Sequence, residues 1–161
     1  MPRIEVYREV KGEEGGWLMR VSQIANSPIC CEIACDATFT KNGETHSFTD
    51  AGLRMRGNTS RRRPEGNGGQ MHQKDKADWH HCHFGINFRK FHKDNDHTIK
   101  GIRKVNLKWF KDDPCYVREL YCYNLFRRYG IWTSAFSTYC RVWLEVKGDA
   151  EKAYLGVYNM I

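Results

Sequence analysis

Hydrophobic and polar residues alternate along much of the chain with a period of two, which is typical of half-buried β-strands. Asn42-Gly43 is a strong signal for a hairpin turn between two of the alternating segments. Val105, Leu107 and Trp109 are the expected core positions of a later one. The alternation predicts strands at 4–7, 17–21, 31–39, 44–48, 52–56, 83–88, 102–109, 139–146 and 153–158.

One segment, residues 114–129, has the periodicity of a helix instead. Asp113 is a good N-cap, and Pro114 suits the first helical position because its missing N–H has no partner there. Gly130 is a natural residue to end the helix. An apolar stripe runs along it through Val117, Leu120, Tyr121 and Leu125. Together these patterns predict an α+β fold, with a mainly antiparallel sheet and one principal helix.

Composition supports a globular protein. The 161 residues are 40% hydrophobic and 13% aromatic, which suits one domain with a sizeable core. The net charge of +7 favours acidic partners such as nucleotide phosphates, nucleic acid or an anionic surface. No apolar run is long enough for a membrane span, and no signal peptide is visible in this chain. Seven cysteines cannot all pair within one chain, so we expect a mostly reduced protein and leave its compartment open.

The segment Arg56-Gly57-Asn58-Thr59-Ser60-Arg61 directly follows the strand predicted at 52–56. Its glycine lets backbone N–H groups approach a ligand, and its hydroxyl and guanidinium groups can donate to phosphate oxygens. A strand that opens into such a loop is a common phosphate-binding arrangement. The alternative is an ordinary polar turn, because Gly, Asn, Thr and Ser are frequent turn residues.

Several segments, in the same order, resemble motifs of the CotH kinase family, the spore coat protein H-like atypical protein kinases. Gly52–Arg61 resembles the family's R-G-N-[ST]-[ST] signature, and Gly101–Lys108 resembles its G-x-[KR]-K-[LV]-N-L strand. Asp113–Leu120 matches its D-P-x-x-x-R-E helix start, and Tyr154–Tyr158 resembles its G-x-Y closing strand. The matching segments span residues 50 to 160.

The resemblance implies a kinase-like small lobe over residues 51–161, preceded by N-terminal strands of uncertain assignment in residues 1–50. It implies binding of ATP with Mg²⁺ or Mn²⁺, and phosphoryl transfer to Ser or Thr of a protein substrate, which in some members is a spore-coat protein. The loop Arg56–Arg61 would contact the phosphates. Glu119 would be the helix carboxylate that pairs with a nucleotide-positioning lysine.

The chain departs from the family pattern in two places. The Lys-Lys pair expected just before the strand at 84–88 is replaced by Trp79-His80-His81-Cys82-His83. A histidine could take the lysine's role, or one of Lys74, Lys76, Arg89 and Lys90. The family's catalytic and metal-binding aspartates lie downstream of the closing strand, and this chain offers no catalytic residue in their place. We therefore expect an inactive nucleotide-lobe fragment of a longer kinase.

A zinc-binding structural module is one alternative. The run His80–His83 contains three histidines and a cysteine, and Cys30, Cys31 and Cys35 form a second group. On a strand, His81 and His83 would share a face and could bind one ion together. Neither group, however, has the ligand spacing of a structural zinc site.

A nucleic-acid-binding module is the second alternative. The positive charge, together with Trp79 and Trp109 as expected exposed aromatics, would suit backbone contacts and base stacking. No recognised binding motif is present, however, and the basic residues do not form one continuous stripe.

Overall fold

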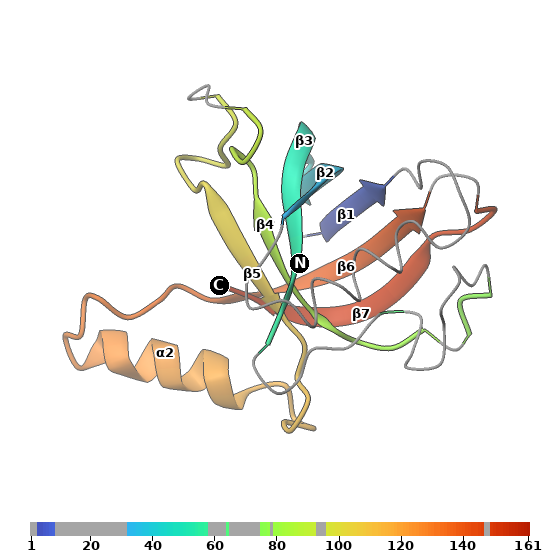
Figure 1. Ribbon diagram of the computed structural model, residues 1–161. Helices are drawn as coiled ribbons and strands as arrows, with labels where there is room; N and C mark the ends of the chain where they lie inside the picture. The colour runs from blue at the N-terminus through green and yellow to red at the C-terminus, as the bar shows by residue number, and fades with distance from the viewer. Residues whose placement is uncertain are drawn as a thin grey trace.

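The computed structural model describes residues 3–8, 32–57, 64, 75–77, 79–92, 96–146 and 149–161. Within these ranges the chain forms a mostly antiparallel sheet with one α-helix, as the sequence predicted (Figure 1). The elements are β1 (Arg3–Arg8), β2 (Ile33–Lys41), β3 (Glu44–Arg56), β4 (His83–Asn87), β5 (Lys104–Lys108), α2 (Arg118–Arg128), β6 (Thr138–Val146) and β7 (Ala153–Met160). The strand predicted at 17–21 lies outside the described residues.

The sheet closes into a barrel with the strand order β1-β2-β3-β4-β5-β7-β6. Neighbouring strands pair antiparallel except at the closure, where β1 pairs β6 in parallel. The alternating pattern predicted the individual strands, but it did not predict that the sheet closes into a barrel. The family resemblance begins near residue 50, which lies inside β3, so β3 belongs both to the N-terminal strands and to the matched region.

The strands predicted separately at 44–48 and 52–56 are in fact one continuous strand, β3. The intervening polar residues interrupt the alternation without ending the strand. Asp50 has a positive φ of 51°, and the register with β2 shifts between Cys35 and Ala37, so a local irregularity absorbs the break. The turn before β3 is confirmed, because Asn42 and Gly43 have φ angles of 53° and 82°.

The barrel interior is filled by alternate residues of the strands. Leu53, Phe84, Ile86 and Leu107 each expose 3% or less of their surface, which places one face of β3, β4 and β5 in the core. Trp109 packs against that core but is only partly buried. Since successive strand residues point to opposite faces, the polar residues between these positions lie on the outer face of the same three strands.

The helix α2 begins at Arg118, four residues later than the sequence predicted. Tyr116 has a φ of 56°, which no α-helix contains, so the residues after Asp113 form a turn first. The N-cap residue is Val117, so the prediction of Asp113 as N-cap and Pro114 as first helical residue is wrong. The Asp113 carboxylate still supports the helix start, because its Oδ2 accepts the N–H groups of Val117 at 2.8 Å and Arg118 at 2.7 Å. The end of the helix is as predicted, since Gly130 has a φ of 80° and donates to the carbonyl of Arg127.

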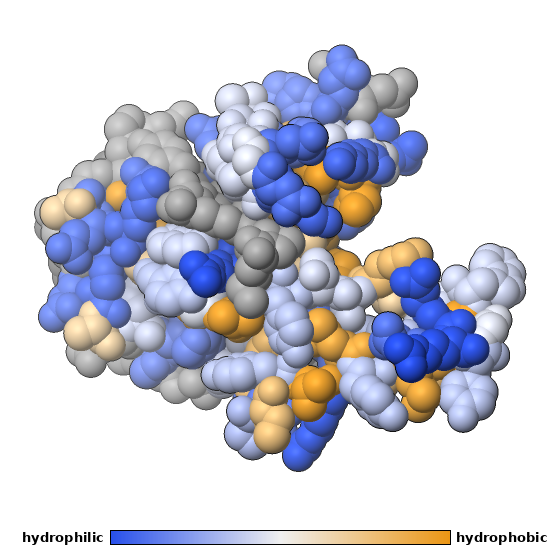
Figure 2. Space-filling view, turned by 180° about the vertical axis from the view of Figure 1, so that it is seen from behind, coloured by the Kyte–Doolittle hydropathy of each residue, from blue (hydrophilic) through white to orange (hydrophobic). Residues whose placement is uncertain are grey.

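The apolar stripe of α2 does not enter the core. None of the helix residues is buried, and Tyr121 and Phe126 are 60% and 44% exposed. Figures 1 and 2 show α2 as a projection beside the barrel, and in Figure 2 a notch separates it from the strand ends. The helix therefore meets the barrel mainly through its first turns, where the polar contacts described next are made.

Candidate functional site

A row of polar side chains crosses the outer face of the sheet near the start of α2. Directly opposed residues of antiparallel strands share a face, so Arg56 on β3 lies beside His83 on β4. In the same way Lys108 on β5 lies beside Asn159 on β7. Leu107 on β5 is opposite Phe84 on β4, so Lys108 lies next to His83 and completes the row.

Glu119, the second residue of α2, lies over this row. Its Oε1 accepts hydrogen bonds from the ammonium of Lys108 and, at 3.2 Å, from the hydroxyl of Tyr123. Its Oε2 accepts the side-chain amide of Asn159 at 2.9 Å. Asn159 is completely buried, so solvent water cannot replace the carboxylate as the hydrogen-bond acceptor of this amide if Glu119 is removed. Both carboxylate oxygens are therefore held by donors from the strands and from the helix itself.

The site favours the charged form of Glu119. Burial raises the pKa of this carboxyl, but the hydrogen bonds from Lys108 and Asn159 outweigh burial and bring the pKa below its usual value. The pKa of Tyr123 is raised by burial and by the neighbouring Glu119 carboxylate, so the phenol stays a hydrogen-bond donor. An ionised carboxylate thus orients the Lys108 ammonium at neutral pH.

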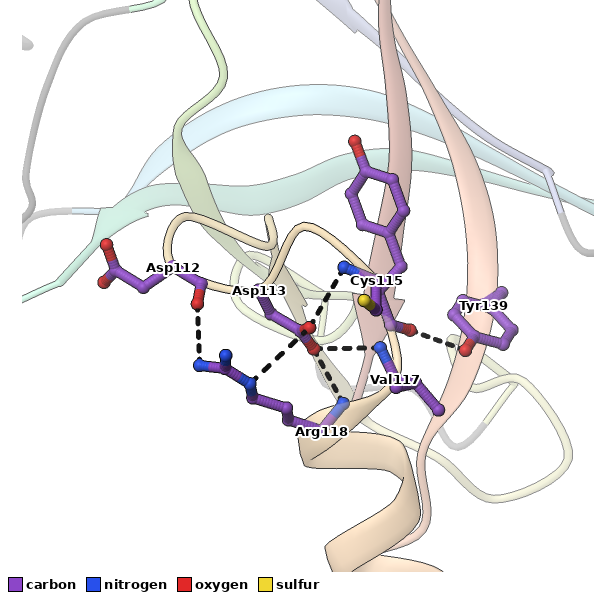
Figure 3. A network of polar contacts seen from close by, with 7 residues as sticks. Asp112, Asp113, Cys115, Val117, Arg118 and Tyr139 are labelled. Carbon is purple, nitrogen blue, oxygen red and sulfur yellow. Dashed lines mark hydrogen bonds and ion pairs between the residues drawn. The ribbon is translucent and has the colours of Figure 1, made fainter.

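A second network fixes the start of α2 and with it the position of Glu119 (Figure 3). The carboxylate of Asp113 receives the N–H groups at the helix start, and the Arg118 guanidinium lies 3.9 Å from it. Arg118 also donates to the carbonyl of Asp112 at 2.9 Å. The hydroxyl of Tyr139 on β6 donates to the carbonyl of Tyr116, which ties the turn to the barrel. The D-P-x-x-x-R-E motif therefore builds the helix start that presents its glutamate.

His83 occupies the middle of the row and is uncharged at neutral pH. Its Nδ1 accepts the backbone N–H of Trp109 at 3.2 Å. Burial, followed by the positive charges of Lys108 and Arg56, lowers the pKa of His83 to about 4. The row thus combines two basic side chains, one ionised carboxylate and one neutral imidazole.

A second row of side chains lies beside the first, two residues further along each strand, where Arg54 is opposite Gly85. A Cβ atom added at Gly85 would lie 3.1 Å from both Arg54 Nε and Arg56 Cδ, so the two arginine side chains lie over this glycine. At the far end of the same face, Glu32 Oε2 lies 3.3 Å from Lys90 Nζ. Glu32 Oε1 lies 4.0 Å from Arg54 Nε. The outer face therefore has a glutamate at each end and basic side chains between them.

The residues predicted for phosphate binding are only partly described. Arg56 ends β3, and Gly57 follows it with a φ of 114°, a backbone conformation that favours glycine. Asn58, Thr59, Ser60 and Arg61 lie outside the described residues.

The lysine partner of Glu119 is Lys108, which the sequence reasoning missed. Of the candidates named there, Lys90 pairs with Glu32 and Lys76 pairs with Asp149, whereas Lys74 lies outside the described residues. A signal for Lys108 was present in the sequence. It is the last residue of the alternating strand before the helix, on the face opposite Val105 and Leu107.

The zinc-binding alternative has little support in the described part of the chain. No group of three or more His, Cys, Asp or Glu side chains there is placed to hold a metal ion. His81 stacks on Trp109 with ring centroids 5.4 Å apart, and the Nδ1 of His83 already accepts a hydrogen bond. Cys30 and Cys31 lie outside the described residues, whereas Cys35 is buried in the core.

The expectation that Trp79 and Trp109 are both exposed, made for the nucleic-acid alternative, is wrong, whereas the core position that the alternation predicted for Trp109 is confirmed in part. Trp79 and Trp109 are both partly buried and pack against the core, because the segment that carries Trp79 folds onto the barrel. Lys76 Nζ lies 4.1 Å from the centre of the Trp79 ring, and His81 stacks on Trp109. Within the ranges that the structure describes, no helix is long and apolar enough to cross a bilayer.

The fold and the site define a small antiparallel barrel in which a strand lysine pairs with a glutamate of the next helix. The family model for CotH kinase protein matches residues 53–161. The chain therefore belongs to the CotH kinase family, which confirms the resemblance found in its motifs. Neither a curated protein nor a solved structure gives a significant match to the chain.

Proposed function

We propose that this chain binds ATP on the outer face of β3, β4 and β5, as the nucleotide-binding small lobe of a CotH-like protein kinase. The observation that carries the proposal is the ion pair between Lys108 on β5 and Glu119 on α2. In protein kinases a lysine on the strand before a helix pairs with a glutamate of that helix, and the pair must be in place for catalysis. The family membership supports the same function.

The neighbouring residues suit the phosphates of a nucleotide. Lys108 is 38% exposed at its side chain, so its ammonium can reach a ligand while Glu119 orients it. Arg56 adds a guanidinium on the next strand but one, and the glycine loop that begins at Gly57 would supply backbone N–H groups. Both oxygens of Glu119 already accept hydrogen bonds, so this carboxylate positions the lysine and is not offered as a metal ligand.

Phosphoryl transfer needs metal ligands and a base that orients the substrate hydroxyl. The described residues contain no cluster of three or more metal-binding side chains. We therefore assign nucleotide binding to this chain, with Mg²⁺ or Mn²⁺ bound along with the phosphates. Transfer to Ser or Thr of a protein substrate is proposed as the activity that this nucleotide binding serves.

Calorimetric titration with MgATP tests the proposal. Lys108→Met should weaken binding roughly 10- to 100-fold, because a charge-assisted hydrogen bond contributes about 1.5–3 kcal/mol. Arg56→Ala should also weaken binding while leaving the contact of Lys108 with Glu119 in place. Lys90→Met is the matched control, since it removes the same charge at the other end of the face, where Lys90 pairs with Glu32.

Two results would contradict the proposal: no MgATP binding by the unmodified protein, or equal affinities for the Lys108→Met and Lys90→Met variants. Thermal unfolding of each variant identifies any loss of affinity that comes from misfolding.

A further inference from the structure

His83 is a member of the polar row to which neither the family motifs nor the kinase comparison gives a definite role. It lies between Arg56 on β3 and Lys108 on β5. Four charged groups act on its ring: Lys108 and Arg56 from the neighbouring strands, Glu119 from α2, and Lys111 from the turn after β5. The imidazole is therefore at the centre of the charged site.

One hydrogen bond settles which ring nitrogen of His83 carries the proton. A neutral imidazole has one donor nitrogen and one acceptor nitrogen. The Nδ1 of His83 accepts the backbone N–H of Trp109 at 3.2 Å, so the proton is on Nε2. Nδ1 and Nε2 lie on different edges of the ring, so the Nε2–H is directed away from the Trp109 backbone.

We propose that His83 is a phosphate-binding residue that donates its Nε2–H to the nucleotide phosphates held by Arg56 and Lys108. The inference rests on the proposed function, because it adds a residue to the same site. The neutral ring supplies a donor without a third positive charge between two cations, where another cation would be repelled. The backbone N–H of Trp109 keeps the ring in this tautomer, because only an unprotonated Nδ1 of His83 can accept its hydrogen bond.

Two substitutions separate the two nitrogens of the ring. His83→Gln places an amide N–H donor about where Nε2 lies, and removes the acceptor for Trp109. His83→Asn places an amide oxygen about where Nδ1 lies, and removes the donor to the ligand. With MgATP as the calorimetric probe, we expect His83→Asn to bind about tenfold more weakly and His83→Gln to stay within about threefold of the unmodified protein.

A purely structural role for His83 predicts the opposite order. The Asn variant would then keep both its stability and its ATP affinity, and the Gln variant would lose them. That order, or equal affinity in both variants, would overturn the inference. Nitrogen-15 NMR of the His83 ring provides a second test that does not depend on binding, because a proton on Nδ1 would also overturn it.

The same titrations distinguish the two proposals. If the unmodified protein binds MgATP and Lys108→Met weakens binding, the nucleotide site stands whatever His83 does. A Lys108 dependence without a difference between the two His83 variants rejects only the role of His83. If the unmodified protein does not bind MgATP, both proposals fail.

Discussion

Two glutamates lie at opposite ends of one sheet face, and the protein holds them in different ways. Glu119 receives an ammonium, an amide at 2.9 Å and a phenol at 3.2 Å, with both oxygens occupied. Glu32 has longer contacts, 3.3 Å to Lys90 and 3.4 Å to Asn87. The amide of Asn159, which donates to Glu119, is completely buried, and that of Asn87, which donates to Glu32, is 9% exposed. The two ammonium groups are similar, with Lys108 38% and Lys90 45% exposed at the side chain, so the ends differ mainly in the number and length of their contacts.

If ATP binds as proposed, the difference identifies the end of the face that would hold its phosphates. Glu119 comes from a helix whose start is fixed by Asp113, so its position is set before any ligand arrives. The Lys108 ammonium is therefore already oriented, which reduces the entropy lost on binding. Glu32 is largely buried, but its contacts with Lys90, Asn87 and Arg54 are 3.3 to 4.0 Å long, so it holds its partners less closely than Glu119 does. The following predictions test this contrast.

Glu119→Ala should have the largest effect on stability, lowering the free energy of unfolding by about 2 kcal/mol. It leaves the buried amide of Asn159 without an acceptor, and an unsatisfied buried group costs about 1–3 kcal/mol. Glu119→Gln should lose less, because it keeps an acceptor oxygen in the site. Urea unfolding measures both variants, and a loss below about 0.5 kcal/mol for the alanine variant would break the contrast.

The contribution of the Glu119 charge should depend on pH. The pKa of Glu119 is lower in the folded protein than its ordinary value, so its stabilisation is fully present above the unfolded pKa and is lost as pH falls through the folded pKa. The stability difference between the unmodified protein and Glu119→Gln should therefore be constant near neutral pH and shrink in acid. Urea unfolding at several pH values measures it. A difference that grew with acidity would have the wrong sign.

Glu32→Gln should have the smallest effect, about 1 kcal/mol or less. The glutamine keeps a side-chain oxygen that can accept from Asn87, and the contact it loses is with an ammonium that is 45% exposed, although Glu32 itself is only 9% exposed. The contact with Lys90 should weaken when salt is added, because the Lys90 ammonium is 45% exposed and salt screens exposed charges. The same unfolding measurement in low and high salt tests it. If Glu32→Gln cost as much as Glu119→Ala, the two ends of the face would be equivalent and the contrast would be lost.

Local patterns predicted most of the individual elements. Alternation located the core residues Leu107 and Phe84, and Gly130 correctly marked the helix end. The helix start was misplaced because Tyr116 has a positive φ, which is rare for a residue other than glycine and has no sequence signal. The barrel closure was missed because it depends on pairing between β1 and β6, which lie far apart in the chain.

The sequence also predicted only part of the candidate site. Glu119 was identified from its motif, whereas its partner was sought before β4, where family members carry lysines. The alternation that buries Leu107 already places Lys108 on the outer face, next to the helix. Asn159 could not be predicted, because it lies in a closing strand that reads as apolar. Only the folded protein shows that this buried amide supports the carboxylate.

The parallel pairing of β1 with β6 also has a consequence for how the chain folds. Arg3 pairs with Arg141, so the barrel cannot close until all the residues from β1 to β6 have been synthesised and brought together. Closing so long a loop carries an entropy cost that local hairpins avoid, and we expect this step to be late and slow in stopped-flow refolding. Until then, β2 and β6 each have an unpaired edge open to other molecules. The first strand therefore protects the barrel against aggregation as well as completing it.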